Sequence, residues 1–336
     1  LCASDSSRRH EPVLYPSMHT HTHPCTHTHT HTNTHTQVNK AFSDQALTTT
    51  AQGGPYSAGD RLWVLDYEMM LVPHYASRKN PHAPIGYSFL SVFPSTEVFR
   101  VLPVRIEVLC ALLCSDLVSF DLFEYARHFL HCCSRLLGLE HRSRRGLIGV
   151  DYNGRRVNVR CGLIGFHVSG TRELRDSEEV VKLKAAYAKE LEGRKVIVSC
   201  DKMDRLSGIT LKLTAFESLM RHSSHVWQGK VVLVQMMRLP YSTYASKELL
   251  PAQLRELEQI EAMVQKINGD FPDSVRLIKP YDETPAKRLA YFGIGSLYLN
   301  TSVRTGLDWS PFEFVMCSEK QMAPLCVSGC TLYLCV

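Results

Sequence analysis

The chain has 336 residues, of which 44% are hydrophobic and 21% charged, so it is ordinary in composition and long enough for two globular domains. The net charge of +5 is mild, and no stripe of Lys and Arg interleaves with aromatic residues, which argues against nucleic-acid binding. No apolar run reaches the roughly 20 residues of a membrane span, and no secretory signal is visible, so we expect a cytoplasmic location without membrane contact.

The first 60 residues are of low complexity, and His and Thr alternate almost without interruption over 19–36. A CA-dinucleotide repeat encodes this alternation, so one interpretation is translated microsatellite with no selected function. The other is a His-rich arm that binds zinc, nickel or copper, at least adventitiously. The imidazoles involved would be those of His19, His21, His23, His27, His29, His31 and His35. Because large apolar residues are few, we predict that residues 1–60 are disordered.

Twelve cysteines are many, but the chain is too long for a small disulfide scaffold and contains no CxxC pair. We interpret them as buried, reduced thiols of an intracellular protein. The alternative is a zinc site made of Cys110, Cys114 and His131, whose spacing supports it poorly.

From residue 61 onward, short apolar runs alternate with segments of helical periodicity. Strands are predicted at 61–66, 85–91 and 116–120, and helices from Ser95 to Leu113 and at 121–137. Pro103 should kink or split the first of these helices. Asn153-Gly154, between two alternating runs within 146–160, predicts a β-hairpin with a type I′ turn.

The second half repeats the alternation of strands and helices. Strands are predicted at 195–200, 230–236, 275–279 and 296–300, and helices at 208–221, 247–267, 285–293 and from Pro311. Alternating βα units imply parallel sheets covered by helices on both faces, with ligands bound beyond the carboxyl ends of the strands. We therefore predict an α/β protein with domains over 61–163 and 164–320 and an unassigned tail at 321–336.

Several ordered segments resemble a known family. They are RLWVLDYEMMLVP (61–73), FPSTEVFRVLPVRIEVL (93–109), SFDLFEYARHFLHCCSRLLG (119–138), LEGRKVIVSCDKMDRLSGITLKLTAFE (191–217), GKVVLVQ (229–235), INGDF (267–271) and SVRTGLDWSPFEF (302–314). In this order they resemble the trehalose-6-phosphate synthases of glycosyltransferase family 20. SRRGLIGVDYNGR (143–155) fits best the divergent plant and algal class. The resemblance implies the GT-B arrangement, in which two Rossmann-like domains face each other across a cleft.

The N-terminal domain is predicted to be incomplete. Family members begin with strands and a Gly-Gly loop before the part that Trp63 matches, whereas here Gly53-Gly54 lacks a flanking apolar strand. A parallel sheet without these strands exposes unpaired backbone and apolar faces. We therefore expect residues 61–163 to fold poorly on their own.

The resemblance also assigns a binding site for the donor UDP-glucose. The family's Asp-Arg-Leu-Asp-Tyr-Ile-Lys-Gly-Ile motif is matched by residues 201–209, so Lys202 replaces the Arg and Ser207 replaces the Lys, while Gly208 is kept. Lys202 keeps the charge but loses the bidentate fork, and Ser207 loses the charge. The implied donor-binding residues are Lys202, Ser207, Gly208, Thr305, Gly306 and Glu313.

Further substitutions lie on the sugar side. In the loop that resembles Arg-Asp-Gly-Met-Asn-Leu, Thr305 replaces an Asp, and Asp308 replaces an Asn and adds a negative charge near the diphosphate. In the N-terminal half, Asp66 matches the Asp of a His-Asp-Tyr-His motif, and Ser91 replaces the His of Leu-His-x-Pro-Phe-Pro. Asp66 and Ser91 are the implied residues of the sugar and acceptor side, and no metal ligand is implied.

The resemblance implies transfer of glucose from UDP-glucose to glucose 6-phosphate, without a cofactor, and association with other subunits of the trehalose pathway. Because the donor- and sugar-site residues are substituted, we expect weakened catalysis. The alternatives are a regulatory or interaction module that still binds a nucleotide sugar, and a defective gene-model fragment, which the His/Thr tract and the tail at 321–336 favour. A start at Leu1 rather than Met also indicates a fragment or a predicted open reading frame.

Overall fold

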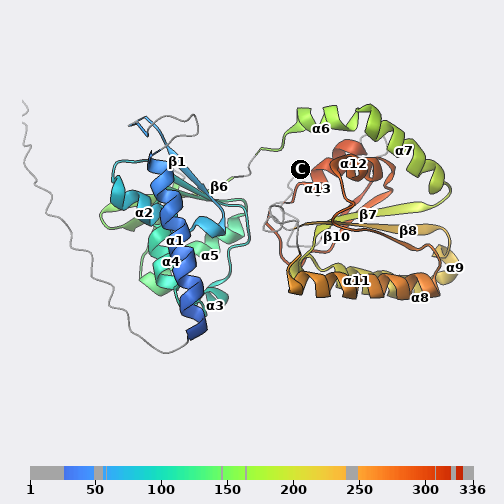
Figure 1. Ribbon diagram of the computed structural model, residues 1–336, viewed down its shortest axis with the longest axis horizontal. Helices are drawn as coiled ribbons and strands as arrows, with labels where there is room; N and C mark the ends of the chain where they lie inside the picture. The colour runs from blue at the N-terminus through green and yellow to red at the C-terminus, as the bar shows by residue number, and fades with distance from the viewer. Residues whose placement is uncertain are drawn as a thin grey trace, which may run out of the picture.

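The structure of the chain is a computed structural model. It describes residues 26–48, 56–57, 59–144, 147–162, 165–239, 249–306, 308–318 and 323–327. Within these ranges the chain forms two α/β bodies, each built around its own sheet (Figure 1). The domain boundary predicted at 163/164 and the Gly53-Gly54 pair lie outside the described residues.

The N-terminal sheet has six strands in the order β1-β2-β3-β6-β5-β4. Its strands are β1 (Leu62–Leu65), β2 (Ile85–Phe89), β3 (Leu117–Phe120), β4 (His141–Arg144), β5 (Leu147–Tyr152) and β6 (Arg155–Cys161). β1, β2, β3 and β6 pair with one another in parallel, whereas the β6–β5 and β5–β4 pairs are antiparallel. The predicted hairpin is confirmed: Asn153 and Gly154 have φ of 49° and 74°, the left-handed values that a type I′ turn needs.

Helices of the N-terminal domain pack on the face of the sheet that carries its core. They are α1 (Thr26–Thr48), α2 (Val72–Lys79), α3 (Thr96–Phe99), α4 (Arg105–Leu112) and α5 (Phe123–Leu137), with the short 3₁₀ helix η1 at Tyr67–Met69. Phe89, Phe93, Phe120 and Phe129 form an aromatic cluster between this face and α5. The split predicted at Pro103 is confirmed, since α3 and α4 lie on either side of it.

The C-terminal sheet is parallel throughout, in the order β11-β10-β7-β8-β9. Its strands are β7 (Lys195–Lys202), β8 (Val231–Arg238), β9 (Val275–Ile278), β10 (Leu297–Asn300) and β11 (Leu325–Val327). β7 and β8 are central and buried, and their pairing extends over eight residues. β11 lies within the tail at 321–336, for which the sequence predicts no element.

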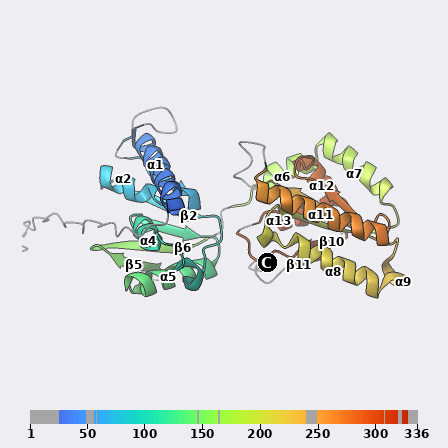
Figure 2. The ribbon, with the colours of Figure 1, turned by 60° about the horizontal axis from the view of Figure 1, so that its bottom comes forward.

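Helices cover both faces of this sheet (Figures 1 and 2). One side has α8 (Ile209–His222), α9 (Ser224–Trp227) and α11 (Pro251–Asp270), and the other has α6 (Val168–Arg175), α7 (Glu178–Glu190), α12 (Pro285–Ile294) and α13 (Ser310–Cys317). A further 3₁₀ helix, η2 (Arg205–Ser207), joins β7 to α8. Two apolar clusters, one on each side, fill the layers between sheet and helices.

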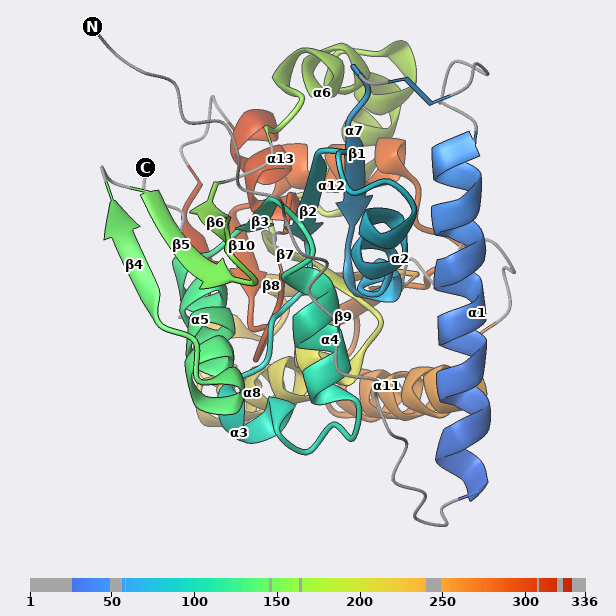
Figure 3. The ribbon, with the colours of Figure 1, turned by 90° about the vertical axis from the view of Figure 1, so that its left-hand side faces the viewer.

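We predicted that residues 1–60 are disordered, and for Thr26–Thr48 this is wrong, because these residues form helix α1. The helix runs beside α2 (Figure 3). Asn39, which is 1% exposed, donates to the Glu68 carbonyl at 2.9 Å and accepts from the Leu71 N–H at 3.1 Å. Tertiary contacts made after the His/Thr tract therefore hold this helix, whereas His19, His21 and His23 lie outside the described residues.

Among the described residues, the helices are too short or too polar to cross a membrane. The same part of the chain holds no group of three or more His, Cys, Asp or Glu side chains placed to bind a metal ion, so Cys110, Cys114 and His131 do not form one. Cys132, Cys133 and Cys200 are buried free thiols, whereas Cys161 and Cys326 are exposed.

Candidate functional site

The two segments predicted to bind the donor meet at the carboxyl edge of the C-terminal sheet. Lys202 ends β7, and the chain turns through η2 to Gly208, which begins α8 with a φ of +67°. The Val303 N–H donates to the Leu206 carbonyl at 2.8 Å, which ties this loop to the segment after β10. A Cβ on Gly208 would lie 2.8 Å from the Thr301 carbonyl oxygen, so only glycine fits both the space and the backbone.

The side chain of Ser207 is committed to its own loop. It is 6% exposed, and both its N–H and its hydroxyl donate to Asp204 Oδ1, at 2.7 and 2.9 Å. A single carboxylate oxygen of Asp204 therefore accepts both donors of Ser207. The position that carries a cation in the family motif supplies neither a charge nor a free hydroxyl.

A buried polar network supports this loop from beneath. Lys212 on α8 donates to Asp201 Oδ2 at 2.5 Å and to Gln235 Oε1 at 3.1 Å, and it also bonds Ser199 Oγ. The side chains of Lys212 and Asp201 are 0% and 1% exposed. Asp201 Oδ1 has no hydrogen-bond partner within the described part of the chain. The network links β7, β8 and α8, and so fixes the position of Lys202 relative to Gly208.

Sequence reasoning missed this network because a lysine within a helix is usually exposed. A signal was present, since Lys212 lies on the face of α8 that also carries Ile209, Leu213 and Phe216.

Carboxylates near the sugar-binding loop are paired with arginines. Glu313 accepts from Arg288 Nε at 2.7 Å and from Arg288 Nη2 at 3.2 Å. Asp308 accepts from Arg238 at 2.8 Å and from the Ser310 N–H at 3.1 Å, which places it at the start of α13. The Arg238 pair offsets the negative charge that Asp308 adds to the loop.

The loop at Thr305 and Gly306 contacts the N-terminal domain. The Tyr125 hydroxyl, from α5, donates to the Thr305 carbonyl at 2.6 Å. A Cβ on Gly306 would lie 2.2 Å from the Leu90 carbonyl oxygen and 3.2 Å from the Ser91 Cα. Gly306 therefore permits a close approach between the two domains, and it brings the predicted donor and sugar sides together.

On the N-terminal side, three polar side chains follow three adjacent parallel strands. Asp66 follows β1, Ser91 follows β2, and Asp121 follows β3. The Ser91 hydroxyl donates to Asp66 Oδ2 at 2.8 Å, so the structure brings together the two residues predicted for the sugar side. Asp66 has a φ of 59°, and its carbonyl accepts from the Tyr87 hydroxyl.

Asp121 is a candidate that sequence reasoning did not assign. It is 8% exposed, and its Oδ2 has no hydrogen-bond partner among the described residues. Burial, and then the charge of Asp66, raises the pKa of Asp121 to about 6. Its position directly after a predicted strand was the available signal. The edge can therefore present two carboxylates to the hydroxyl groups of a sugar.

Comparisons with known proteins show which family the chain resembles. The model of the family described as "Glycosyltransferase family 20" matches residues 6–332. The chain is 38% identical over 266 residues to the probable UDP-forming alpha,alpha-trehalose-phosphate synthase 7 of Arabidopsis thaliana, covering 77% of this chain and 30% of that protein. It is 35% identical over 285 residues to synthase 5 of the same plant, and this match covers 84% of this chain and 32% of that protein. The chain thus spans about a third of the length of these curated relatives.

Solved structures show the same fold. The N-terminal domain of a Candida albicans trehalose-6-phosphate phosphatase is 26% identical with a TM-score of 0.80, covering 95% of this chain and 64% of that one. A trehalose-phosphate synthase from Burkholderia xenovorans, solved with glucose-6-phosphate, is 22% identical with a TM-score of 0.79, covering 89% and 64%. The predicted GT-B-like pair of Rossmann-type domains is confirmed.

Proposed function

Because this chain belongs to glycosyltransferase family 20, we propose that it is a trehalose-6-phosphate-synthase-like module that binds UDP-glucose but transfers glucose to glucose 6-phosphate only weakly. Its role is then regulatory or is exerted within an assembly with other subunits of the trehalose pathway. Retaining transfer depends on preorganised positive charge at the departing diphosphate.

The observation that carries the proposal is the pairing of Ser207 with Asp204. The start of α8 is where a diphosphate would find backbone N–H groups and the positive end of a helix. The family places a lysine there, whereas here Ser207 carries no charge and its hydroxyl donates to Asp204 at 2.9 Å. Loss of one charged hydrogen bond costs about 1.5–3 kcal/mol, which corresponds to roughly a ten- to hundredfold loss of transition-state stabilisation.

Other features support residual binding of the donor. Lys202 keeps a cation at the carboxyl end of β7, and the conformation of Gly208 lets the loop turn directly from η2 into the start of α8. Glu313 lies in the first turn of α13, where it accepts from Arg288. A ribose could bind Glu313 through the carboxylate lone pairs that the arginine leaves open.

The test compares UDP binding with turnover in the same preparation. Millimolar UDP or UDP-glucose should raise the thermal midpoint, since a ligand at 100 times its Kd adds about 2.7 kcal/mol. Turnover to trehalose 6-phosphate should be slow. Absence of any shift would refute the donor site, and fast turnover would replace the proposal by that of an active synthase.

A gain-of-charge variant sharpens this test. Ser207→Lys should tighten UDP binding by roughly ten- to hundredfold, because it restores one charged hydrogen bond to the diphosphate. Ser207→Met has a similar length without the charge and serves as the matched control. Equal UDP affinities in the two variants would show that the diphosphate does not sit at the start of α8.

A further inference from the structure

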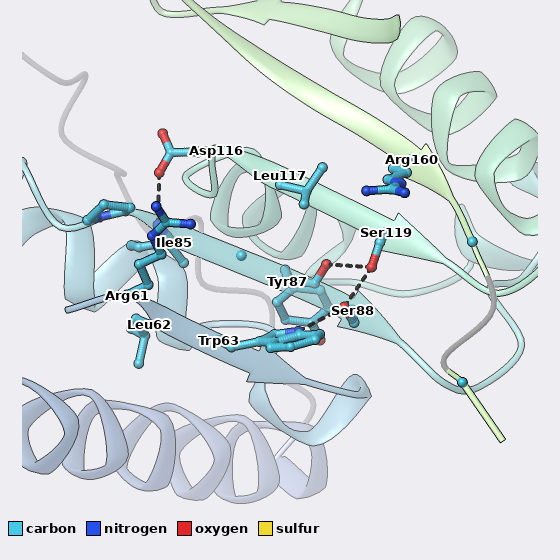
Figure 4. Close-up of a pocket in the computed structure, with 14 residues that line it drawn as sticks. Arg61, Leu62, Trp63, Ile85, Tyr87, Ser88, Asp116, Leu117, Ser119 and Arg160 are labelled. Atoms are coloured by element: carbon cyan, nitrogen blue, oxygen red, sulfur yellow. Dashed lines mark hydrogen bonds between the residues drawn. The ribbon is translucent and has the colours of Figure 1, made fainter. Parts of the chain in front are cut away.

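A cavity of about 690 Å³ lies on the N-terminal sheet between Trp63 and Arg160 (Figure 4). The polar groups of its floor satisfy one another, since Trp63 Nε1 donates to Ser88 Oγ at 2.9 Å and Ser88 Oγ lies 2.6 Å from Ser119 Oγ. These groups therefore need no ligand. The carboxyl edge of the C-terminal sheet differs, because a buried donor there, Arg238 Nε, has no hydrogen-bond partner in the described part of the chain.

Arg238 lies at the carboxyl end of β8, next to Lys202 on β7. The two residues pair in the parallel register, and the Met203 N–H donates to the Arg238 carbonyl at 2.9 Å, so the strand ends stay together. Side chains alternate along a strand, and Cys200 and Met236, two residues earlier on each strand, lie in the apolar cluster shared with α12 and α13. Lys202 and Arg238 are therefore neighbours on this face, at the edge where a parallel sheet binds its ligands.

The Arg238 guanidinium is fixed by one carboxylate and keeps further donors. Its Nη2 donates to Asp308 Oδ1 at 2.8 Å, and Asp308 is itself held by the Ser310 N–H at 3.1 Å and by Asn300 Nδ2 at 3.2 Å. A guanidinium has five N–H donors, and within the described ranges Asp308 is the one residue that accepts from it. The Arg238 side chain is 17% exposed, so a ligand can reach part of it. The pair with Asp308 thus orients the guanidinium without using all of its donors.

The chemistry of this position suits a phosphoryl group. The planar guanidinium matches the oxygens of a phosphate, and its charge strengthens each hydrogen bond. The family resemblance puts a diphosphate at this edge, with cations at positions 202 and 207, of which Ser207 has lost the charge. Asp308 alone would repel a diphosphate. Arg238 offsets this carboxylate and has donors left for a second anion.

We propose that Arg238 is a further binding residue for the diphosphate of the donor nucleotide, and that it compensates in part for the charge lost at Ser207. The inference rests on the proposed function, because it requires that the donor site binds UDP. Asp308 is then a positioning residue, which holds the Arg238 guanidinium at the carboxyl end of β8. A chain that lacks the lysine of the family motif can in this way keep affinity for UDP.

The test compares two variants that leave no unpaired carboxylate at position 308. Asp308→Asn keeps Arg238, whereas Asp308→Asn combined with Arg238→Met removes it, so the two differ in the guanidinium alone. Isothermal titration calorimetry on the full chain should show UDP binding at least about tenfold weaker in the double variant, the loss expected for one charged hydrogen bond. Uridine, which lacks the diphosphate, should bind both variants equally.

Arg194→Met is the control at the opposite end of the same sheet. Arg194 directly precedes β7 and donates to the Asp273 carbonyl at 3.1 Å, so its removal should leave the UDP affinity of the wild type unchanged. Circular dichroism confirms that each variant folds.

The possible results separate this inference from the proposed function. Equal UDP affinities in the two Asp308 variants would show that Arg238 only neutralises Asp308, and would overturn the inference while the donor site stands. An equal loss of uridine binding, or a loss of glucose 6-phosphate binding with UDP binding unchanged, would overturn it as well. Absence of UDP binding by the wild type would refute the donor site itself, and this inference with it.

Discussion

The replacement Lys212→Met tests the charged residue that is most buried among those the structure describes. Methionine has nearly the length of lysine, so the packing of α8 changes little, but Asp201 loses the cation 2.5 Å from its Oδ2. Ser199 and Gln235 lose the same donor. Both charged side chains are 1% exposed or less, so water cannot replace the lysine.

The expected magnitude follows from this burial. Removing one partner of a buried ion pair costs about 3–5 kcal/mol, because the other charge stays buried without compensation. For a domain of this size, each kcal/mol lowers the midpoint by roughly 2–4 °C, so the C-terminal transition should fall by roughly 6–20 °C. Differential scanning calorimetry measures this directly.

A double variant distinguishes the cost of leaving Asp201 charged and unpaired from the cost of losing the contacts of Lys212. Asp201→Asn combined with Lys212→Met removes both charges and should recover roughly half of the loss or more. Lys195→Met changes an exposed lysine at the start of β7 and should alter the midpoint little. A loss below about 1 kcal/mol for Lys212→Met, or a double variant no better than the single one, would refute the reasoning.

Three further predictions follow from other sites. Asp121→Asn should raise the free energy of unfolding, measured by urea titration, more at pH 7 than at pH 4. The pKa of Asp121 is about 6 in the folded protein and lower in the unfolded chain, so wild-type stability falls as the pH rises from the unfolded pKa to the folded one. Equal gains at both pH values would contradict this reasoning. Gly306→Ala should separate the two domains, because the alanine Cβ would clash with the Leu90 carbonyl oxygen. Small-angle X-ray scattering should then show a larger radius of gyration than that of the wild type. An unchanged radius would contradict the contact. Gly154→Ala should lower the free energy of unfolding by about 1 kcal/mol in chemical denaturation, because alanine is strained at the φ of 74° that the β5–β6 turn requires. A neutral effect would argue against the type I′ turn.

The sequence predicts those features that depend only on residues close together in the chain. The Asn153-Gly154 turn and the break at Pro103 depend on backbone preferences of the residues themselves, and both were predicted. Helix α1 could not be predicted in this way. Asn39 bonds the backbone near η1, 29 residues further along the chain, and no local pattern records such a contact.

The candidate site shows the same division. Parallel strands bring their carboxyl ends to one edge of a sheet, so the predicted strand ends place Asp66 and Ser91 together at the edge of the N-terminal sheet and Lys202 at the edge of the C-terminal sheet. Their roles stay predictions. The pairing of Ser207 with Asp204 and the network of Lys212 depend on side-chain directions, which residue identities alone do not determine.

The two outer strands of the N-terminal sheet differ in their protection against aggregation. β4, at one edge, has the sequence HRSR, and its arginines discourage a further strand from adding to it. β1, at the other edge, has the sequence LWVL, and among the described strands it pairs with β2 alone. Between these two described edges, β1 is therefore the one more open to intermolecular strand addition, and a charged residue in place of Leu65, which is already half exposed, should reduce that addition.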